Sequence, residues 1–202
     1  MPQAVPPDIL LRVRKVQAIT IAWMSTEAAV ALFAAWRGRS PALLAFGGDS
    51  AIELASAVIV FWRFRSNAAS EHLERRAARI AGGLLFALAA CVIASSVSAL
   101  LGHSEAKPSL LGIGILAAAA VLMPLLAREK RRLSAQTGSA ALRADAAESA
   151  LCGYLSLIAL VGLLINAVWH VSWADPLAAL VIVPVILREG WEAVQGRPCD
   201  CG

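Results

Sequence analysis

Long apolar runs without charges dominate this chain and restrict what it can fold into. They alternate with short basic stretches such as REKRR at 128–132. A helix needs about 20 residues to cross a hydrocarbon core of about 30 Å. Hydrophobic residues make up 59% of the 202 and charged residues 16%, whereas a soluble domain has about 45–50% and about 25%. The pattern therefore predicts an all-α integral membrane protein.

Six segments are predicted to be transmembrane helices, and they cover most of the chain. They are residues 16–36, 42–62, 80–101, 109–128, 144–169 and 174–194. The sixth has a shorter apolar part, but Trp173 and Trp191 flank it like the aromatic anchors of membrane interfaces. We therefore divide the chain into an N-terminal segment (1–15), a six-helix transmembrane domain (16–195) and a short tail (196–202).

The basic residues predict the orientation of this domain. With six spans, both termini lie on one side, and all but three of the 18 Lys and Arg residues fall on that side. The exceptions are Arg37, Arg39 and Lys107. The positive-inside rule then places both termini in the cytoplasm, and the membrane is predicted to be the inner (plasma) membrane of a bacterium. This asymmetry explains the net charge of +4, so nucleic-acid binding is not predicted.

A few acidic residues lie inside the predicted spans, where a charge costs roughly 2.5–3.5 kcal/mol. The second span carries Asp49 and Glu53 at i and i+4, and the fifth carries Glu148 and Cys152 at the same spacing. Residues four apart project from one face of a helix. By helical rise, Glu53 lies about 18 Å from the outer surface and Cys152 about 13 Å from the inner one, which brings them nearly level. The sequence therefore predicts that these four side chains meet around a divalent cation, in a tetrahedral set that suits zinc.

Other interpretations of these acidic residues stay open. Paired arginines or lysines would neutralise them, but the sequence places none at mid-depth, and protonated carboxyl groups are the other alternative. Glu27, in the first span, is a candidate partner of the ligands, proton carrier or minor ligand. Asp145 is a further candidate of this kind, or else a helix N-terminal residue whose charge the helix dipole favours.

Three stretches together resemble the cation diffusion facilitators, the cation efflux family. They are FGGDSAIELASAVIVFWRFR, RADAAESALCGYLS and WADPLAALVIVPVILREGWEA. The resemblance implies a six-helix metal/proton antiporter, usually homodimeric, whose site pairs two residues of helix two with two of helix five. On this chain those positions are Asp49 and Glu53, and Glu148 and Cys152.

Two departures from the family pattern qualify this resemblance. Helix five commonly has His and Asp where this chain has Glu148 and Cys152, which bears on metal selectivity. The chain is also expected to lack the family's usual cytoplasmic metal-binding domain after the sixth span, and it then resembles a compact transmembrane-only branch. Any homodimer is then expected to form through the transmembrane helices.

The expected mechanism follows from ligand chemistry. Desolvation disfavours charged carboxylates, so the empty site is expected to hold protons. A divalent cation from the cytoplasm displaces them, because coordination needs deprotonated ligands. Alternating access then exposes the site outward, where protons return and release the ion. The same residues thus act as ligands and proton carriers, and no prosthetic group is expected.

Zinc is the predicted ion, with cobalt, iron and cadmium as alternatives, because a thiol joins the carboxylates. The tail residues Cys199 and Cys201 either collect a thiophilic metal or stay as reduced thiols. A non-transporting metal-binding membrane scaffold is the alternative from another class. An intramembrane enzyme is not predicted, since no His lies near Cys152 within the membrane.

Overall fold

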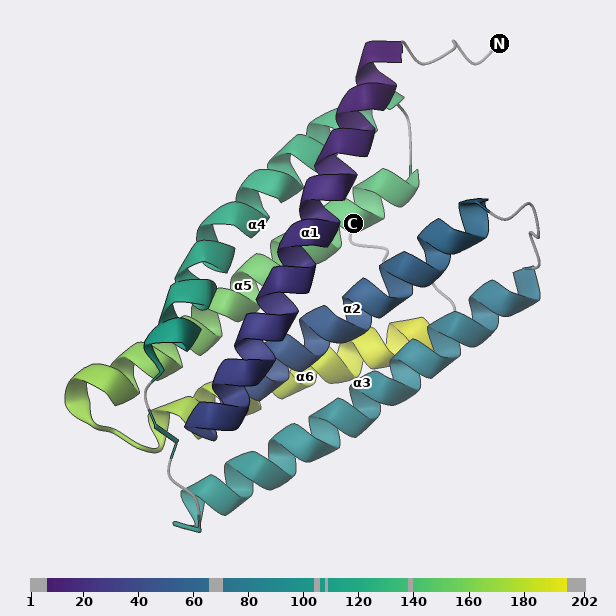
Figure 1. The fold of residues 1–202 in the computed structure, drawn as a ribbon. Coiled ribbons are helices and arrows are strands. Elements are labelled where there is room, and N and C mark those ends of the chain that lie inside the picture. Colours follow the sequence, from purple (N-terminus) through teal and green to yellow (C-terminus); the bar gives the residue numbers. More distant parts are fainter. Residues whose placement is uncertain (1–6, 66–70, 104–105, 108, 138–139, 196–202) are drawn as a thin grey trace.

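The computed structural model describes residues 7–65, 71–103, 106–107, 109–137 and 140–195. Within these ranges the chain forms six α-helices and no strand (Figure 1), which agrees with the predicted fold class. The tail with Cys199 and Cys201 lies outside the described residues. The helices are α1 (Pro7–Gly38), α2 (Pro41–Arg65), α3 (Glu71–Leu100), α4 (Leu110–Thr137), α5 (Ala140–Trp169) and α6 (Ala174–Gln195).

Several helices are longer than the spans predicted from hydropathy. The largest differences are in α1, α3 and α4, which have 32, 30 and 28 residues. Their added turns are rich in Arg, Lys, Glu, Gln and Ala, which are good helix formers outside the apolar region as well. The REKRR stretch is accordingly helical, and α4 continues through it to Thr137. This extension places Lys130 inside the bundle, with consequences described below.

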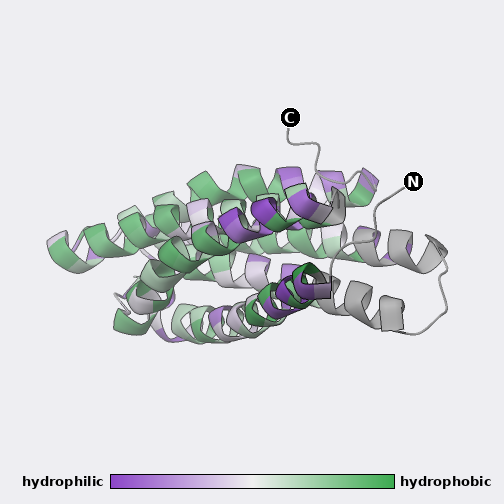
Figure 2. Cartoon of the chain, turned by 90° about the horizontal axis from the view of Figure 1, so that it is seen from above, coloured by the Kyte–Doolittle hydropathy of each residue, from purple (hydrophilic) through white to green (hydrophobic). Residues whose placement is uncertain are grey.

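The surface of the bundle suits a lipid environment. Among the described residues, four helical segments are long and apolar enough to cross a membrane: Pro7–Gly38, Arg79–Leu100, Leu110–Thr137 and Asp145–Trp169. Large apolar side chains point outward, among them Leu110 (88% exposed) and Trp36 (76% exposed), and hydrophobic residues cover most of the described helices (Figure 2). Soluble monomers rarely expose such a surface. The chain is therefore an integral membrane protein, as the sequence predicts.

Helix α2 is the central element, because it contacts α1, α3, α5 and α6. Two adjacent glycines allow this packing. A methyl group at Gly47 would lie 2.9 Å from the Cβ of Ala31 on α1, and one at Gly48 would lie 2.5 Å from Leu88 Cδ1 on α3. Small residues permit such close helix approach in membranes. Because Asp49 follows these glycines directly, the same packing holds the start of the predicted acidic pair in the core.

The first turn of α2 is held by a side chain from α6. Ser40 caps α2, since its Oγ accepts a hydrogen bond from Leu43 N at 3.1 Å. The carboxylate of Asp175 accepts from Ser40 Oγ at 2.5 Å and from Ala42 N at 3.2 Å. Asp175 is itself in the first turn of α6 and is buried. The N-termini of α2 and α6 are therefore joined at one end of the bundle.

Candidate metal site

Three carboxylates from two helices meet inside the bundle. Asp49 and Glu53 of α2 and Glu189 of α6 each offer one oxygen, and these oxygens lie within 4.8 Å of one another. We call this group the carboxylate trio. The side chains of Asp49 and Glu189 interact directly with each other.

Among the described residues, one oxygen of Asp49 has no hydrogen-bond partner. Asp49 is 1% exposed, and within the described part of the chain its Oδ1 accepts no hydrogen bond. Leaving a buried acceptor unsatisfied costs about 1–3 kcal/mol, and more when the group is charged. The cost is removed if a cation binds there, since a carboxylate oxygen is a donor to divalent metals. The trio therefore has the chemistry of a cation site with an unused ligand atom.

Glu27 forms a second buried cluster beside the trio. Its carboxylate accepts hydrogen bonds from Trp23 Nε1 at 2.6 Å, Ser50 Oγ at 2.7 Å and Cys152 Sγ at 3.3 Å. The side chain is fully buried. Ser50 follows Asp49 on α2, so the two clusters are neighbours along one helix. With three donors around it, Glu27 is satisfied, in contrast to Asp49.

The structure does not bring the predicted α5 residues into the trio. The thiol of Cys152 is buried and donates to Glu27, with Ser50 Oγ at 3.9 Å. It remains within electrostatic range of Asp49 and Glu53. Glu148 is exposed on the isolated chain, and its charge also interacts with those of Asp49 and Glu53. The roles of Glu148 and Cys152 as ligands stay predictions.

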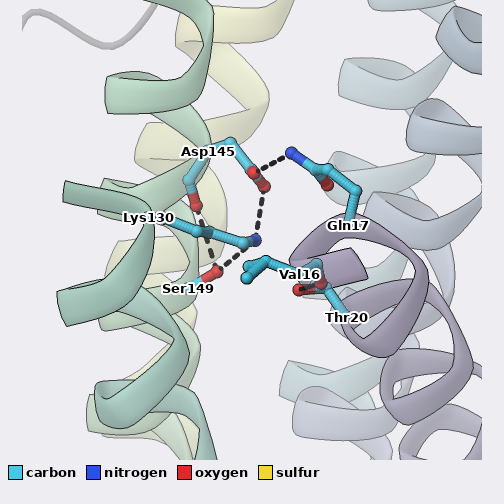
Figure 3. Close-up of polar contacts among 6 residues, drawn as sticks. All are labelled: Val16, Gln17, Thr20, Lys130, Asp145 and Ser149. Atoms are coloured by element: carbon cyan, nitrogen blue, oxygen red, sulfur yellow. Dashed lines mark hydrogen bonds and ion pairs between the residues drawn. The ribbon is translucent and has the colours of Figure 1, made fainter. Parts of the chain in front are cut away.

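Asp145 lies in a hydrogen-bonded network that already contains a positively charged side chain, that of Lys130. Its Oδ1 accepts from Lys130 Nζ at 2.7 Å and its Oδ2 from Gln17 Nε2 at 2.7 Å. Lys130 Nζ also donates to Ser149 Oγ at 2.8 Å. These side chains link α1, α4 and α5, and Thr20 lies next to them on α1 (Figure 3). The Lys130 side chain is fully buried although it carries a charge.

Lys130 is a basic partner of Asp145 that was not predicted from the sequence. The apolar part of the fourth span ends before residue 130, so the sequence assigned Lys130 to the cytoplasmic extension. In the structure it continues the buried face of α4, which includes Met123, Ala127 and Ser134. These positions follow the helical spacing of three and four residues. Extending that periodicity past the apolar run would have predicted that Lys130 is buried.

Glu189 is the residue that the sequence analysis missed. It lies next to Arg188 near the end of the sixth span, and both were assigned to the membrane interface. Yet Ile182 and Ile186 are fully buried, and Glu189 falls on the same face of α6 at the next helical interval. As with Lys130, the helical spacing predicts that Glu189 faces the core of the bundle, whereas hydropathy does not.

The fold is that of a six-helix membrane protein whose buried carboxylates are the donors that hard cations require. The chain belongs to the cation efflux family, since residues 18–195 match the cation efflux transmembrane domain. This confirms the family that the sequence resembles. Members of this family are transporters and not enzymes.

A named relative comes from Bacillus subtilis (strain 168). It is "Manganese efflux system protein MneS", and the two chains are 27% identical over 119 residues. The match covers 59% of this chain and 41% of the relative. The chain therefore spans less than half of the relative's length.

Proposed function

We propose that this transporter exports a divalent transition-metal ion from the cytoplasm in exchange for protons. The observation that carries the proposal is the carboxylate trio, in which Asp49 is buried and its Oδ1 has no partner among the described residues. The ion binds at Asp49 and Glu53 and displaces the protons that these groups otherwise hold, because coordination requires deprotonated ligands. Alternating access then exposes the same residues to the other side of the membrane, where protons release the ion.

The α5 residues complete the site in this proposal. Helix α2 contacts both α5 and α6, so its acidic pair is able to exchange partners between them. Glu148 and Cys152 both interact electrostatically with Asp49 and Glu53, and they are the proposed ligands from α5. Glu27 holds the Cys152 thiol by a hydrogen bond and is the proposed proton acceptor when that thiol coordinates the metal.

Two donor sets suit two different ions. Zn²⁺, the ion predicted from the sequence, suits a set that includes the thiolate of Cys152. Mn²⁺ prefers oxygen ligands, which are the only donors in the trio. Because Cys152 Sγ donates to Glu27 here, we take Mn²⁺ as the leading substrate and Zn²⁺ as the second. The name of the Bacillus subtilis relative supports the same order. Cobalt, iron and cadmium follow.

The test is a flux measurement in proteoliposomes that report metal and luminal pH together. We expect Mn²⁺ entry coupled to proton exit from an acidic lumen, and loss of both in Asp49→Asn. Asp8→Asn is the matched control, since Asp8 is exposed in the first turn of α1. Zn²⁺ and then the other ions are run in the same assay. If folded protein binds metal but moves none, the scaffold alternative replaces transport.

The proposed transporter acts as a homodimer formed through its transmembrane helices. Dimerisation is tested by the mass of the protein in nanodiscs, where a single chain of 21.2 kDa would contradict it.

A further inference from the structure

We propose that Glu189 of α6 is a third ligand of the transported ion and sets its preference for Mn²⁺ over Zn²⁺ and Cd²⁺. This inference rests on the proposed function and concerns the same site. It assigns a metal-binding role to a helix that the predicted ligand set leaves out. Two independent observations carry it: the position of the Glu189 carboxylate and the unpartnered oxygen of Asp49.

The first observation is geometric. Glu189 is the residue that joins the α2 pair in the structure, with one oxygen of each group within 4.8 Å of the others. A metal ion centred among three such oxygens would need only small shifts to reach coordination distances of about 2.0–2.6 Å. The second observation is Asp49 Oδ1, which is buried and unpartnered in the described part of the chain. It is the ligand atom that the arrangement leaves available.

Glu189 is held in place by the packing of its neighbour. Gly190 is buried against α3, where a methyl group added to Gly82 would lie 2.7 Å from Gly190 O. A methyl group added to Gly190 would lie 3.2 Å from Leu85 Cβ. The backbone of α6 beside Glu189 is thus fixed against α3 at van der Waals distance. Ligands placed by rigid, closely packed elements are the ones that select among metals by geometry.

The chemical type of the ligand atoms decides which ions bind more tightly when Glu189 is present. All three ligand atoms of the trio are carboxylate oxygens, and such ligands suit Mn²⁺, whereas thiolates suit Zn²⁺ and Cd²⁺. Without Glu189, the site would keep Asp49 and Glu53 with Glu148 and Cys152, a set with one sulfur donor among oxygens. Removing Glu189 therefore shifts the preference from Mn²⁺ towards the thiophilic ions.

The experiment measures equilibrium binding of Mn²⁺ and Cd²⁺ to purified full-length protein, with Mn²⁺ followed by its electron paramagnetic resonance signal. We expect Glu189→Gln to weaken Mn²⁺ binding by about tenfold or more while Cd²⁺ binding changes much less. Glu129→Gln is the matched control, because Glu129 forms a surface ion pair with Arg12 at 3.0 Å and should leave both affinities unchanged. Equal Mn²⁺ affinity in Glu189→Gln and wild type would overturn the inference.

A second variant keeps the test decisive if Glu189→Gln does not fold. Glu189→Cys replaces an oxygen donor by sulfur, so Cd²⁺ should add an ultraviolet thiolate-to-metal absorption beyond that of wild type and bind more tightly than Mn²⁺. The absence of any added absorption would place residue 189 away from the ion.

Asp49→Asn separates this inference from the proposed function. If wild type transports metal, Asp49→Asn does not, and Glu189→Gln retains the wild-type preference, only the inference fails. If wild type neither binds nor moves any of the ions, the proposed function fails and the inference fails with it.

Discussion

Two groups of acidic residues inside this bundle, the Asp145 network and the carboxylate trio, differ in what balances their charge. Asp145 is neutralised by Lys130 of the same chain at 2.7 Å. In the carboxylate trio, by contrast, no ion pair between described residues includes Asp49 or Glu53. A buried carboxylate with its own lysine has no need of an external cation. The comparison supports the proposal that the first group is structural and that the second binds the transported ion.

The largest loss of stability should come from breaking the ion pair between Lys130 and Asp145. Lys130→Met leaves Asp145 with a partly buried, unpaired charge, and we expect a loss of about 3 kcal/mol in unfolding free energy. Denaturation of the purified protein in mixed micelles measures it. Lys107→Met removes an exposed lysine and is the control. The double variant Lys130→Met with Asp145→Leu should regain most of the loss. If it does not, Lys130 contributes through packing and not through its charge.

The next effect concerns the trio, where a substitution should change metal binding and leave the stability of the metal-free protein unchanged. Metal binding stabilises the folded protein by about 2.7 kcal/mol when the ion is at 100 times its dissociation constant. We expect Asp49→Asn to lose this metal-dependent gain while keeping the stability of the metal-free protein, because the variant removes an unsatisfied carboxylate. Thermal unfolding with and without Mn²⁺ is the measurement. A full metal-dependent shift in Asp49→Asn would mean that the ion binds elsewhere.

A third prediction concerns pH. Because the ion competes with protons for the trio, Mn²⁺ affinity should rise with pH and fall as the solution becomes more acidic. The change is about tenfold, or 1.4 kcal/mol, per pH unit for each proton displaced. Titrations at several pH values give the slope, which should be reduced in Glu53→Gln. A flat profile in wild type would show that binding releases no proton.

The smallest loss of stability should come from a change at Gln17, which contacts the Lys130–Asp145 pair through a hydrogen bond to Asp145. Gln17→Leu removes one hydrogen bond to Asp145 and leaves the ion pair intact. The expected cost is about 1 kcal/mol, with unchanged Mn²⁺ binding. The same denaturation and binding assays apply. Impaired metal binding in this variant would contradict the division into a structural and a cation-binding group.

The sequence predicts the helices well, and it predicts that Asp49 and Glu53 share one face of α2, because hydropathy and the i, i+4 spacing are properties of single helices. It does not predict which other helix faces that pair. Glu53 and Cys152 come out level by helical rise, yet depth says nothing about rotation or tilt, and Glu189 is the group that meets the pair in the structure. Glu189 and Lys130 were missed for one reason. Both are charged residues beyond an apolar run, and hydropathy assigns such residues to the interface even when they continue a buried helical face.

The Asp175 contacts at the start of α2 have a consequence for how the trio opens. They join α2 and α6 at one end, and Glu189 lies 14 residues further along α6. That distance is about 21 Å along the helix, so a change of about 5° in the angle between the two helices moves Glu189 by about 2 Å. Such a displacement is comparable to a metal–oxygen bond length. With Asp175 as the pivot, a slight rotation of α6 together with the α3 helix packed against it would separate the Glu189 oxygen from the oxygens of α2.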